Sequence, residues 1–223
     1  MNAIQNAGGH VGLTARNYPI AAATDIKAGQ VVKLSAGLVV SAAAAETGAI
    51  LGIAAESHTG VADCLNPRNN GEEIKVFDNP ELIFECPAPV FAAASGSATT
   101  IVPASGAVDA AAADDAFNGS VAVLIEKAAG STNTDPVGKR ITITDYAKSG
   151  TVLTKESGGT PYAGDVYEFY PAIGSAVCAL STKRKNAVVT AAGASALRVI
   201  GHDPARHCIR LMAAKHQNGN TVS

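Results

Sequence analysis

The sequence predicts a mainly β protein. Apolar and polar residues alternate with a period of two in at least five segments, which is the pattern of strands with one buried face. In residues 73–77, for example, Ile74 and Val76 share one face while Lys75 and Phe77 take the other. No stretch keeps the helical period of a long amphipathic helix. We therefore expect at most one or two short helices, near residues 42–46 or 110–116.

The first 20 residues precede the first clear strand signal. They are polar, contain glycine, and follow neither the helical nor the strand period. We therefore predict an extended N-terminal arm at residues 1–20 that becomes ordered against a partner, with a frayed terminus as the simpler alternative. The β-rich body is expected to cover residues 21–216.

Residues 24–56 carry the densest strand signals. Runs rich in β-branched residues, at 31–34, 38–40 and 50–53, are separated by glycine-containing turns, and glycine permits the positive φ angles of tight turns. We predict a meander of three strands. The segment contains no catalytic type of Ser, Cys, His or acidic cluster, so we expect it to be a scaffold.

Two more strands are predicted at residues 73–77 and 81–86, after an exposed loop at 57–71. The turn Asp-Asn-Pro separates them, and Pro87 ends the second strand because proline cannot donate a hydrogen bond to a β-ladder. Residues 92–118 are rich in Ala, Ser, Gly and Thr. We predict that they form a low-complexity excursion from the body, with a short helix as the alternative for the alanine-rich part.

The second half of the chain again shows strand patterns. Tyr167, Phe169 and Tyr170 form an aromatic cluster, and anchoring of the core is its preferred interpretation. Residues 182–186 form a basic run, predicted to be a solvated loop, and residues 217–223 form a polar tail. The predicted strands are 121–126, 141–144, 151–154, 165–170, 197–200 and 208–212, of which the last two are joined by a turn.

Composition limits the classes of partner. Much of the apolar content is alanine, which buries little area, and hydrophobic stabilisation amounts to about 25 cal/mol per Å². We therefore expect a thin core and an oligomer or a docking partner that adds stability.

The net charge of −2 provides no basic field for nucleic acid or for an anionic membrane. No apolar run suffices to span a bilayer and no signal-peptide pattern is present, so we expect synthesis in a cytoplasm.

The four cysteines, Cys64, Cys86, Cys178 and Cys208, are widely spaced and include no CxxC pair. A free cysteine in a strand behaves as a small buried hydrophobic residue. We therefore predict reduced, structural thiols rather than disulfides or metal ligands.

Motifs for catalysis are missing from the sequence. It lacks GxSxG, and no glycine-rich turn carries Lys followed by Ser or Thr. His202, His207, Cys208 and His216 form the best metal-ligand candidate, because two histidines separated by four residues could meet on a hairpin turn. They come without an HExxH or paired CxxC motif, so exposed turn histidines are the preferred interpretation. We assign no catalytic, cofactor-binding or metal-binding residue and expect a protein that is not an enzyme.

A series of motifs occurs in a characteristic order along the chain. DIKAGQVVKLSAGLVV, GAILGIAAES, GEEIKVF and ELIFEC, within residues 25–86, are followed by ALRVIGHDP and HCIRLMAAKHQ, within residues 196–217. This series resembles the decoration (cement) proteins of tailed bacteriophages. The resemblance covers most of the chain, apart from the predicted arm and the alanine-rich middle.

The resemblance implies a β-barrel or β-tulip-like body that binds the outside of an icosahedral phage head. Such proteins often assemble as homotrimers and stabilise contacts between neighbouring major capsid subunits. The expected location is therefore the capsid surface of the virion, after synthesis in the cytoplasm of a bacterial host.

Two other functions remain open at this point. One is a different structural module of a virion, such as a head fibre or a tail tube, which a low copy number per particle would favour. The other is a metal-dependent hydrolase that uses His202, His207 and Cys208, which stoichiometric bound metal would favour.

Overall fold

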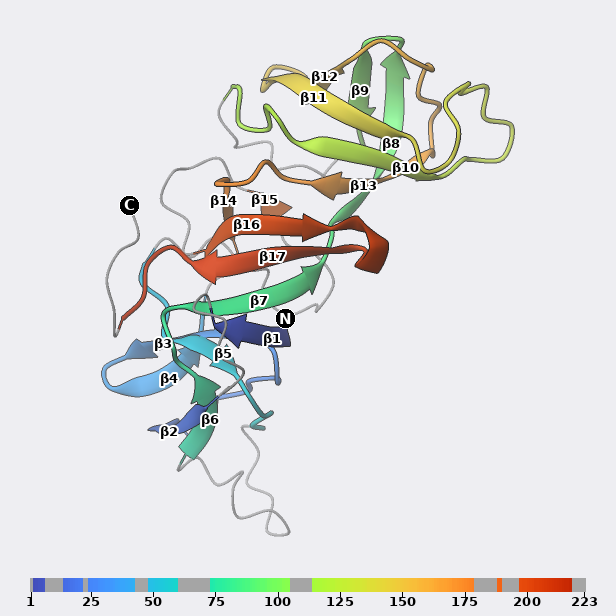
Figure 1. Cartoon of the computed structure of the whole chain (residues 1–223). Helices are drawn as coiled ribbons and strands as arrows, with labels where there is room; N and C mark the ends of the chain where they lie inside the picture. Colours follow the sequence, from blue (N-terminus) through green and yellow to red (C-terminus); the bar gives the residue numbers. More distant parts are fainter. Residues whose placement is uncertain are drawn as a thin grey trace.

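The computed structural model shows an elongated stack of three β assemblies (Figure 1). A closed six-stranded barrel lies at the top of the view, a six-stranded sheet in the middle, and a five-stranded sheet at the bottom. The structure describes residues 2–6, 14–21, 24–42, 48–59, 73–104, 114–178, 188–189 and 197–217, with the backbone alone at 2–6, 176–178 and 188–189. The mainly β fold with a barrel confirms the predicted class.

The five-stranded sheet is rolled around a small apolar core. An isolated parallel bridge between Ile20 and Val39 joins its two edges, so the sheet nearly closes on itself. Inside lie buried residues that include Ile26, Leu51 and Ile74. The strand order is β2 (Ala15–Pro19), β6 (Glu73–Phe77), β5 (Gly52–Ala54), β3 (Val31–Ser35) and β4 (Leu38–Ser41).

Strands β3 and β5 are buried on both faces. Neighbouring residues of a strand point to opposite faces, and Val31 and Val32 accordingly belong to two different apolar clusters. Ile53 and Ala54 divide in the same way. Val31 and Ile53 join a larger core that also contains apolar residues of the six-stranded sheet, and this shared core packs the two sheets together.

The three strands predicted at residues 31–53 exist, but their pairing differs from a meander. Strand β5 pairs with β3, with Val31 opposite Ile53, and β3 therefore lies between β4 and β5. The sequence predicted the strands from their residue types. It could not predict the pairing, because the strands that lie along the two edges of β3 are set by tertiary packing and not by the residue types of β3 itself.

The prediction of an N-terminal arm that becomes ordered only against a partner needs correction. Residues 2–6 form β1, which pairs with β7, and Ala15–Pro19 form β2, which pairs with β6. Tyr18 donates a hydrogen bond to Asp78, and Ile20 is buried within the rolled sheet. The segment therefore gains its order from its own chain. Its polar sequence obscured this, because an edge strand pairs through backbone groups and exposes much of its side-chain surface.

The six-stranded sheet connects distant parts of the chain. Strands β6 and β7, which are consecutive in the sequence, lie in different sheets, so residues 78–81 form a crossover between the sheets. Strands β16 and β17 form a hairpin around the 3₁₀ turn Pro204–Arg206. The order is β1 (Asn2–Asn6), β7 (Leu82–Pro87), β17 (Cys208–Ala213), β16 (Leu197–Asp203), β14 (Ala176–Cys178) and β15 (Val188–Val189).

The barrel is one continuous piece of chain that is inserted between β7 and β14. Its first strand β8 pairs with its last strand β13, so the chain enters and leaves the barrel side by side. The closed order is β10 (Val121–Glu126), β11 (Arg140–Ala147), β12 (Val152–Lys155), β9 (Thr100–Pro103), β8 (Val90–Ser97) and β13 (Val166–Tyr170).

Aromatic side chains fill the barrel. Phe91 stacks on Tyr167, and Phe117 contacts Tyr146 and Phe169 edge to face. All five are buried. The predicted role of the aromatic cluster in the core is confirmed.

The low-complexity excursion predicted at residues 92–118 is replaced, over much of its length, by barrel strands. Strands β8 and β9 occupy residues 90–97 and 100–103 and pair with each other. Their Ala and Ser residues gave a weak strand signal. The helices considered near 42–46 and 110–116 fall largely outside the described residues. Within the described residues, the helical element is the 3₁₀ turn Pro204–Arg206.

The predicted polar tail begins with a docked residue. The Gln217 side chain accepts a hydrogen bond from the Leu34 amide (2.7 Å) and donates one to the Leu34 carbonyl (3.1 Å). The Gln217 amide also donates to the carbonyl of Ile50. These contacts tie the end of the six-stranded sheet to the five-stranded sheet, whereas residues 218–223 lie outside the described part.

Gly52 allows β5 to approach the end of β6. A Cβ atom at this position would lie 2.0 Å from the carbonyl oxygen of Phe77. We expect Gly52→Ala to destabilise the protein by about 3 kcal/mol, because backbone atoms must move apart. Gly37→Ala is the control, since its Cβ meets open space and costs only the strain of a positive φ, about 1 kcal/mol. Urea unfolding of both variants measures the difference, and equal losses would contradict the close approach.

Candidate functional site at the junction of barrel and sheet

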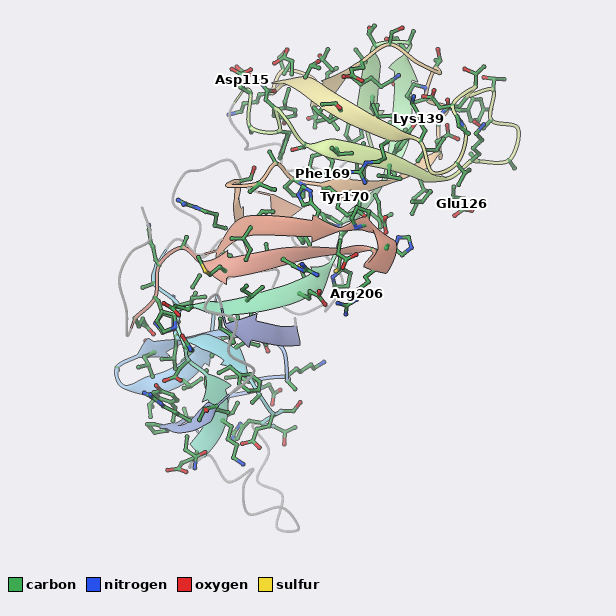
Figure 2. All side chains as sticks on the ribbon, in the orientation of Figure 1. Asp115, Glu126, Lys139, Phe169, Tyr170 and Arg206 are labelled. Carbon is green, nitrogen blue, oxygen red and sulfur yellow. The ribbon has the colours of Figure 1, made fainter. Side chains whose placement is uncertain are left out.

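The junction between the barrel and the six-stranded sheet is formed by one strand with two different faces. Tyr167 and Phe169 of β13 point into the barrel, where they contact Phe91. The alternate residues, Glu168 and Tyr170, point the other way. Figure 2 shows Tyr170 between the barrel and the β16–β17 hairpin. Both side chains are buried even though they lie outside the barrel, because the hairpin covers them.

Glu168 is the centre of this junction. Its carboxylate accepts a hydrogen bond from the Tyr170 hydroxyl at 2.7 Å. Nδ1 of His207, beyond the 3₁₀ turn, lies 2.9 and 3.0 Å from the two carboxylate oxygens. Because a carboxylate only accepts, Nδ1 is the donor. Glu168 thus joins a barrel strand to the hairpin of the sheet.

Further contacts hold the two chain crossings in place, which are residues 88–89 between β7 and the barrel and residues 171–175 between the barrel and β14. Nε2 of His202 donates to the carbonyl of Pro171, which immediately follows β13, and the His202 ring lies against Tyr170. The amide of Ala88, which follows β7, donates to the carbonyl of His207 at 2.9 Å. Each crossing therefore contacts the same hairpin. We call Glu168, Tyr170, His202 and His207 the junction cluster.

An ion-pair network lies beside the junction cluster, on the sheet itself. Glu85 of β7 is 5% exposed and accepts from Arg206 at 2.8 Å and from Arg210 at 3.4 Å. Arg210 also pairs with Asp203 at 3.1 Å. A buried carboxylate is costly without a partner. The two arginines therefore allow Glu85 to stay charged between β7 and β17.

Among the described residues, one group of donors is close enough to share a metal ion. Ligand atoms of Glu85, Asp203 and Cys208 lie within 4.8 Å of one another. Both carboxylates are already engaged by arginine, whose positive charge opposes a cation. Burial, followed by the neighbouring Glu85 and Asp203, raises the pKa of Cys208, which disfavours the thiolate that a metal needs. We interpret the group as an ion-pair network.

The structure does not assemble the four donors considered in the sequence. His202 and His207 belong to the junction cluster, and Cys208 lies beside Glu85. His216 is at the far end of the sheet, where its backbone forms a bridge with Ile50. The sequence spacing placed His202 and His207 on one hairpin correctly. Their ring nitrogens are directed at acceptors of the barrel strand and its exit.

A second buried polar network closes the end of the barrel where β10 and β13 meet the loops. Asp165 has no exposed surface and accepts from the amides of Ala128 and Tyr162 at 3.0 Å and from Asn133 Nδ2 at 2.9 Å. The same Asn133 nitrogen also donates to the Tyr167 hydroxyl. Although burial alone would raise it, these hydrogen bonds hold the pKa of Asp165 below its usual value.

Lys155 extends this network to the loop that contains Gly159. It is 3% exposed and donates to the carbonyls of Ala98 at 2.9 Å and Gly159 at 3.1 Å. Burial lowers the pKa of Lys155. Gly159 must lack a side chain, because its Cβ would lie 2.2 Å from Asn133 Oδ1. The network fixes two loops against the barrel wall.

The sequence did not reveal which residues of these two polar networks contact one another. Glu168 was recognised only as a strand residue and Tyr170 only as a core aromatic residue, and Asp165, Asn133 and Lys155 were not singled out. One signal was available for Glu168, which is a charged residue within a strand that is otherwise apolar and aromatic. Such a residue requires a polar partner, but which residue serves as the partner depends on which hairpin covers the strand.

Several predicted features cannot be placed. The basic run at residues 182–186 lies outside the described residues, as does most of the loop at 57–71. Of the cysteines, Cys86 and Cys208 are free and buried, which confirms the prediction for these two. Cys64 and the side chain of Cys178 fall outside the described part. Within the described ranges, no helix has the length and apolar character that crossing a membrane requires.

Comparisons with protein-family models, with curated proteins and with solved structures gave no match for this chain.

We expect Asp165→Asn to lower stability by about 2 kcal/mol at neutral pH, because the amide nitrogen that replaces one carboxylate oxygen cannot accept the backbone hydrogen bond made there. The lowered pKa also means that ionised Asp165 stabilises the fold above its unfolded-state pKa of about 4 and that this contribution is lost as the pH falls through the folded-state value. Urea unfolding at a series of acidic pH values should therefore show a weaker acid dependence in the variant. The exposed Asp145→Asn is the control, and a variant as acid-sensitive as the wild type would contradict the assignment.

The thiols give a separate test of the core. Burial raises the pKa of Cys86 to about 12, so little thiolate is present in the folded protein. We expect alkylation of Cys86 at about pH 8 to be about a thousandfold slower in the native state than in denaturant, where all four cysteines should react. Mass-spectrometric peptide mapping measures both rates. Fast native labelling of Cys86, or a disulfide in the non-reduced protein, would contradict the prediction.

Proposed function

We propose that this protein is a structural component of a tailed-phage virion that decorates the outer surface of the capsid. In this role it binds the major capsid protein and stabilises contacts between neighbouring subunits. The proposal assigns the protein no enzymatic activity. It places the protein on the virion after synthesis in the bacterial cytoplasm.

The order of motifs along the chain supports this proposal. The quoted segments supply β3, β4, β5, β6 and β7 at one end of the chain and β16 and β17 at the other. Outside the N-terminal strands, they account for most of the two sheets, whereas the barrel is the inserted part. A closed barrel agrees with the barrel-like body that the resemblance implies.

The observation that carries the proposal is how this chain uses its buried charges. Asp78, Glu85, Asp165 and Glu168 are all buried, and each accepts hydrogen bonds or ion pairs from another strand or loop of the same chain. These groups join strands and fix loops. Such a use of polar groups is expected of a scaffold whose task is to hold its shape.

Weak contacts that are repeated across a capsid lattice give high avidity without a single strong site. An alanine-rich protein also gains stability when it associates, because association removes further apolar surface from water. We therefore propose a homo-oligomer, a trimer in the first instance, as the form that docks.

A mass-spectrometric inventory of purified particles, taken before and after mild treatment that strips loosely held proteins, tests the proposal. We expect about as many copies as the capsid lattice has equivalent positions, released together as trimers, and rebinding of the purified protein to stripped capsids but not to free capsid subunits. Native mass measurement gives the oligomeric state. A few copies at one vertex or on the tail would indicate a head-fibre or tail-tube module, and absence from the particle would overturn the proposal.

A further inference from the structure

We propose that His207 and Glu168 form a pH-responsive latch, which holds the barrel tightly against the six-stranded sheet when His207 is protonated and loosens as His207 loses its proton. This inference concerns the chain by itself and does not depend on capsid binding. It rests on how the barrel is inserted, on how few partners Glu168 has, and on where His207 lies.

The barrel is attached to the sheet through two short crossings. Residues 88–89 lead from β7 into the barrel, and residues 171–175 lead from the barrel to β14. The amide of Phe169 donates to the carbonyl of Pro89, so the two crossings lie side by side. The barrel and the sheet also share one continuous apolar core, which holds the barrel in place. The contact between His207 and Glu168 therefore acts on local opening at the two crossings and not on the orientation of the whole barrel.

Glu168 needs a cationic partner because it is buried. Its exposed fraction is 6%, and removing a carboxylate from water is costly unless opposite charge or strong hydrogen bonds compensate. One of its partners, the Tyr170 hydroxyl, is neutral. Burial and the bond to Glu168 raise the pKa of Tyr170, so this phenol stays protonated at neutral and mildly alkaline pH. His207 is the partner that can carry a positive charge.

The backbone holds His207 in position while leaving its ring open to solvent. The residue adopts a left-handed conformation, with φ of 53°, at the end of the 3₁₀ turn. Its amide donates to the carbonyl of Pro204, and its carbonyl accepts from Ala88. The side chain is 67% exposed. Protons can therefore exchange between the ring and water.

His202 and the two acidic groups on the sheet beside the junction already have partners of their own, so the latch is assigned to the contact between His207 and Glu168. His202 donates from Nε2 to a carbonyl, a bond that both its neutral and its charged form can make. The acidic groups on the sheet, Glu85 and Asp203, already pair with arginines. Other ionisable groups that the structure describes on the strands around the junction are Glu126 on β10, Arg140 on β11, Arg198 on β16, Cys86 on β7, Cys208 on β17, and Arg206 and Arg210 of the ion-pair network.

The direction of the effect follows from charge. A protonated His207 gives Glu168 a charge-assisted hydrogen bond, which is stronger than a neutral one. Imidazole changes its charge between about pH 5 and about pH 8. The junction is therefore tight at the acidic end of this range and looser at the alkaline end.

Amide hydrogen exchange of the full-length chain, read by mass spectrometry and corrected for the intrinsic pH dependence, tests the latch. The reporters are the amides of Ala88, Phe169 and Gly174 at the two crossings, and the amide of Lys155, which donates to Thr99 inside the barrel, is the internal reference. In the wild type we expect exchange at the crossings to be about threefold faster at about pH 8 than at about pH 5.5, with no change at Lys155.

Two variants separate the latch from general stability. His207→Gln should exchange at the rapid rate at both pH values, because glutamine carries no charge. Glu168→Gln should behave likewise, and the exposed Glu126→Gln, which also removes a carboxylate from the barrel, should keep the wild-type response. An equal pH response in the wild type and in His207→Gln would overturn the proposal. His207 is exposed, so this variant decides the question even if Glu168→Gln does not fold.

Discussion

The pairing of β7 with β17 is the interaction on which the rest of the structure depends. Phe84 lies opposite Leu211 in this pair, and the whole barrel separates the two strands in the sequence. When they pair, the β16–β17 hairpin is brought beside the exit of the barrel, and β1 gains a strand to pair with. Closing so long a loop costs entropy that grows only slowly with its length. The apolar core shared by barrel, sheet and rolled sheet provides the compensating burial.

Buried charge is the second constraint, and at each site the chain satisfies it with donors of its own, although the kind of donor differs. Glu85 lies between strands and pairs with two arginines of the neighbouring hairpin, whereas Asp165 lies at a barrel end and relies on amide donors. Glu168 sits between assemblies and takes a phenol and an imidazole. Removing one of these donors would leave a buried carboxylate with fewer partners in a poorly solvated place, which is more costly than the bond itself is worth. The polar groups therefore specify how the assemblies fit together as well as stabilising them.

Two alanines of the barrel have a structural reason for their small size. A closed barrel of six strands has a narrow interior, and this one already holds the rings of Phe91, Phe117, Tyr146, Tyr167 and Phe169. Small residues such as Ala93 and Ala122 are fully enclosed beside them. Ala93, which lies within the segment that looks like a low-complexity linker, is thus suited to a narrow barrel, since a larger side chain there would overpack the interior.

The sequence alone determined the fold class, most of the strands and the aromatic core, because period-two alternation and turn residues are local properties. It also identified the hairpin that carries His202 and His207. Only the tertiary structure decided which strands pair, that residues 2–6 and 15–19 belong to the sheets, and that residues 90–103 close a barrel. Backbone hydrogen bonds are the same for every residue type, so an edge strand or an alanine-rich strand acquires its identity from its neighbour. The junction cluster has the same origin: Glu168 and His207 are 39 residues apart, and only the packing of β13 against the hairpin places a proton donor beside the buried carboxylate.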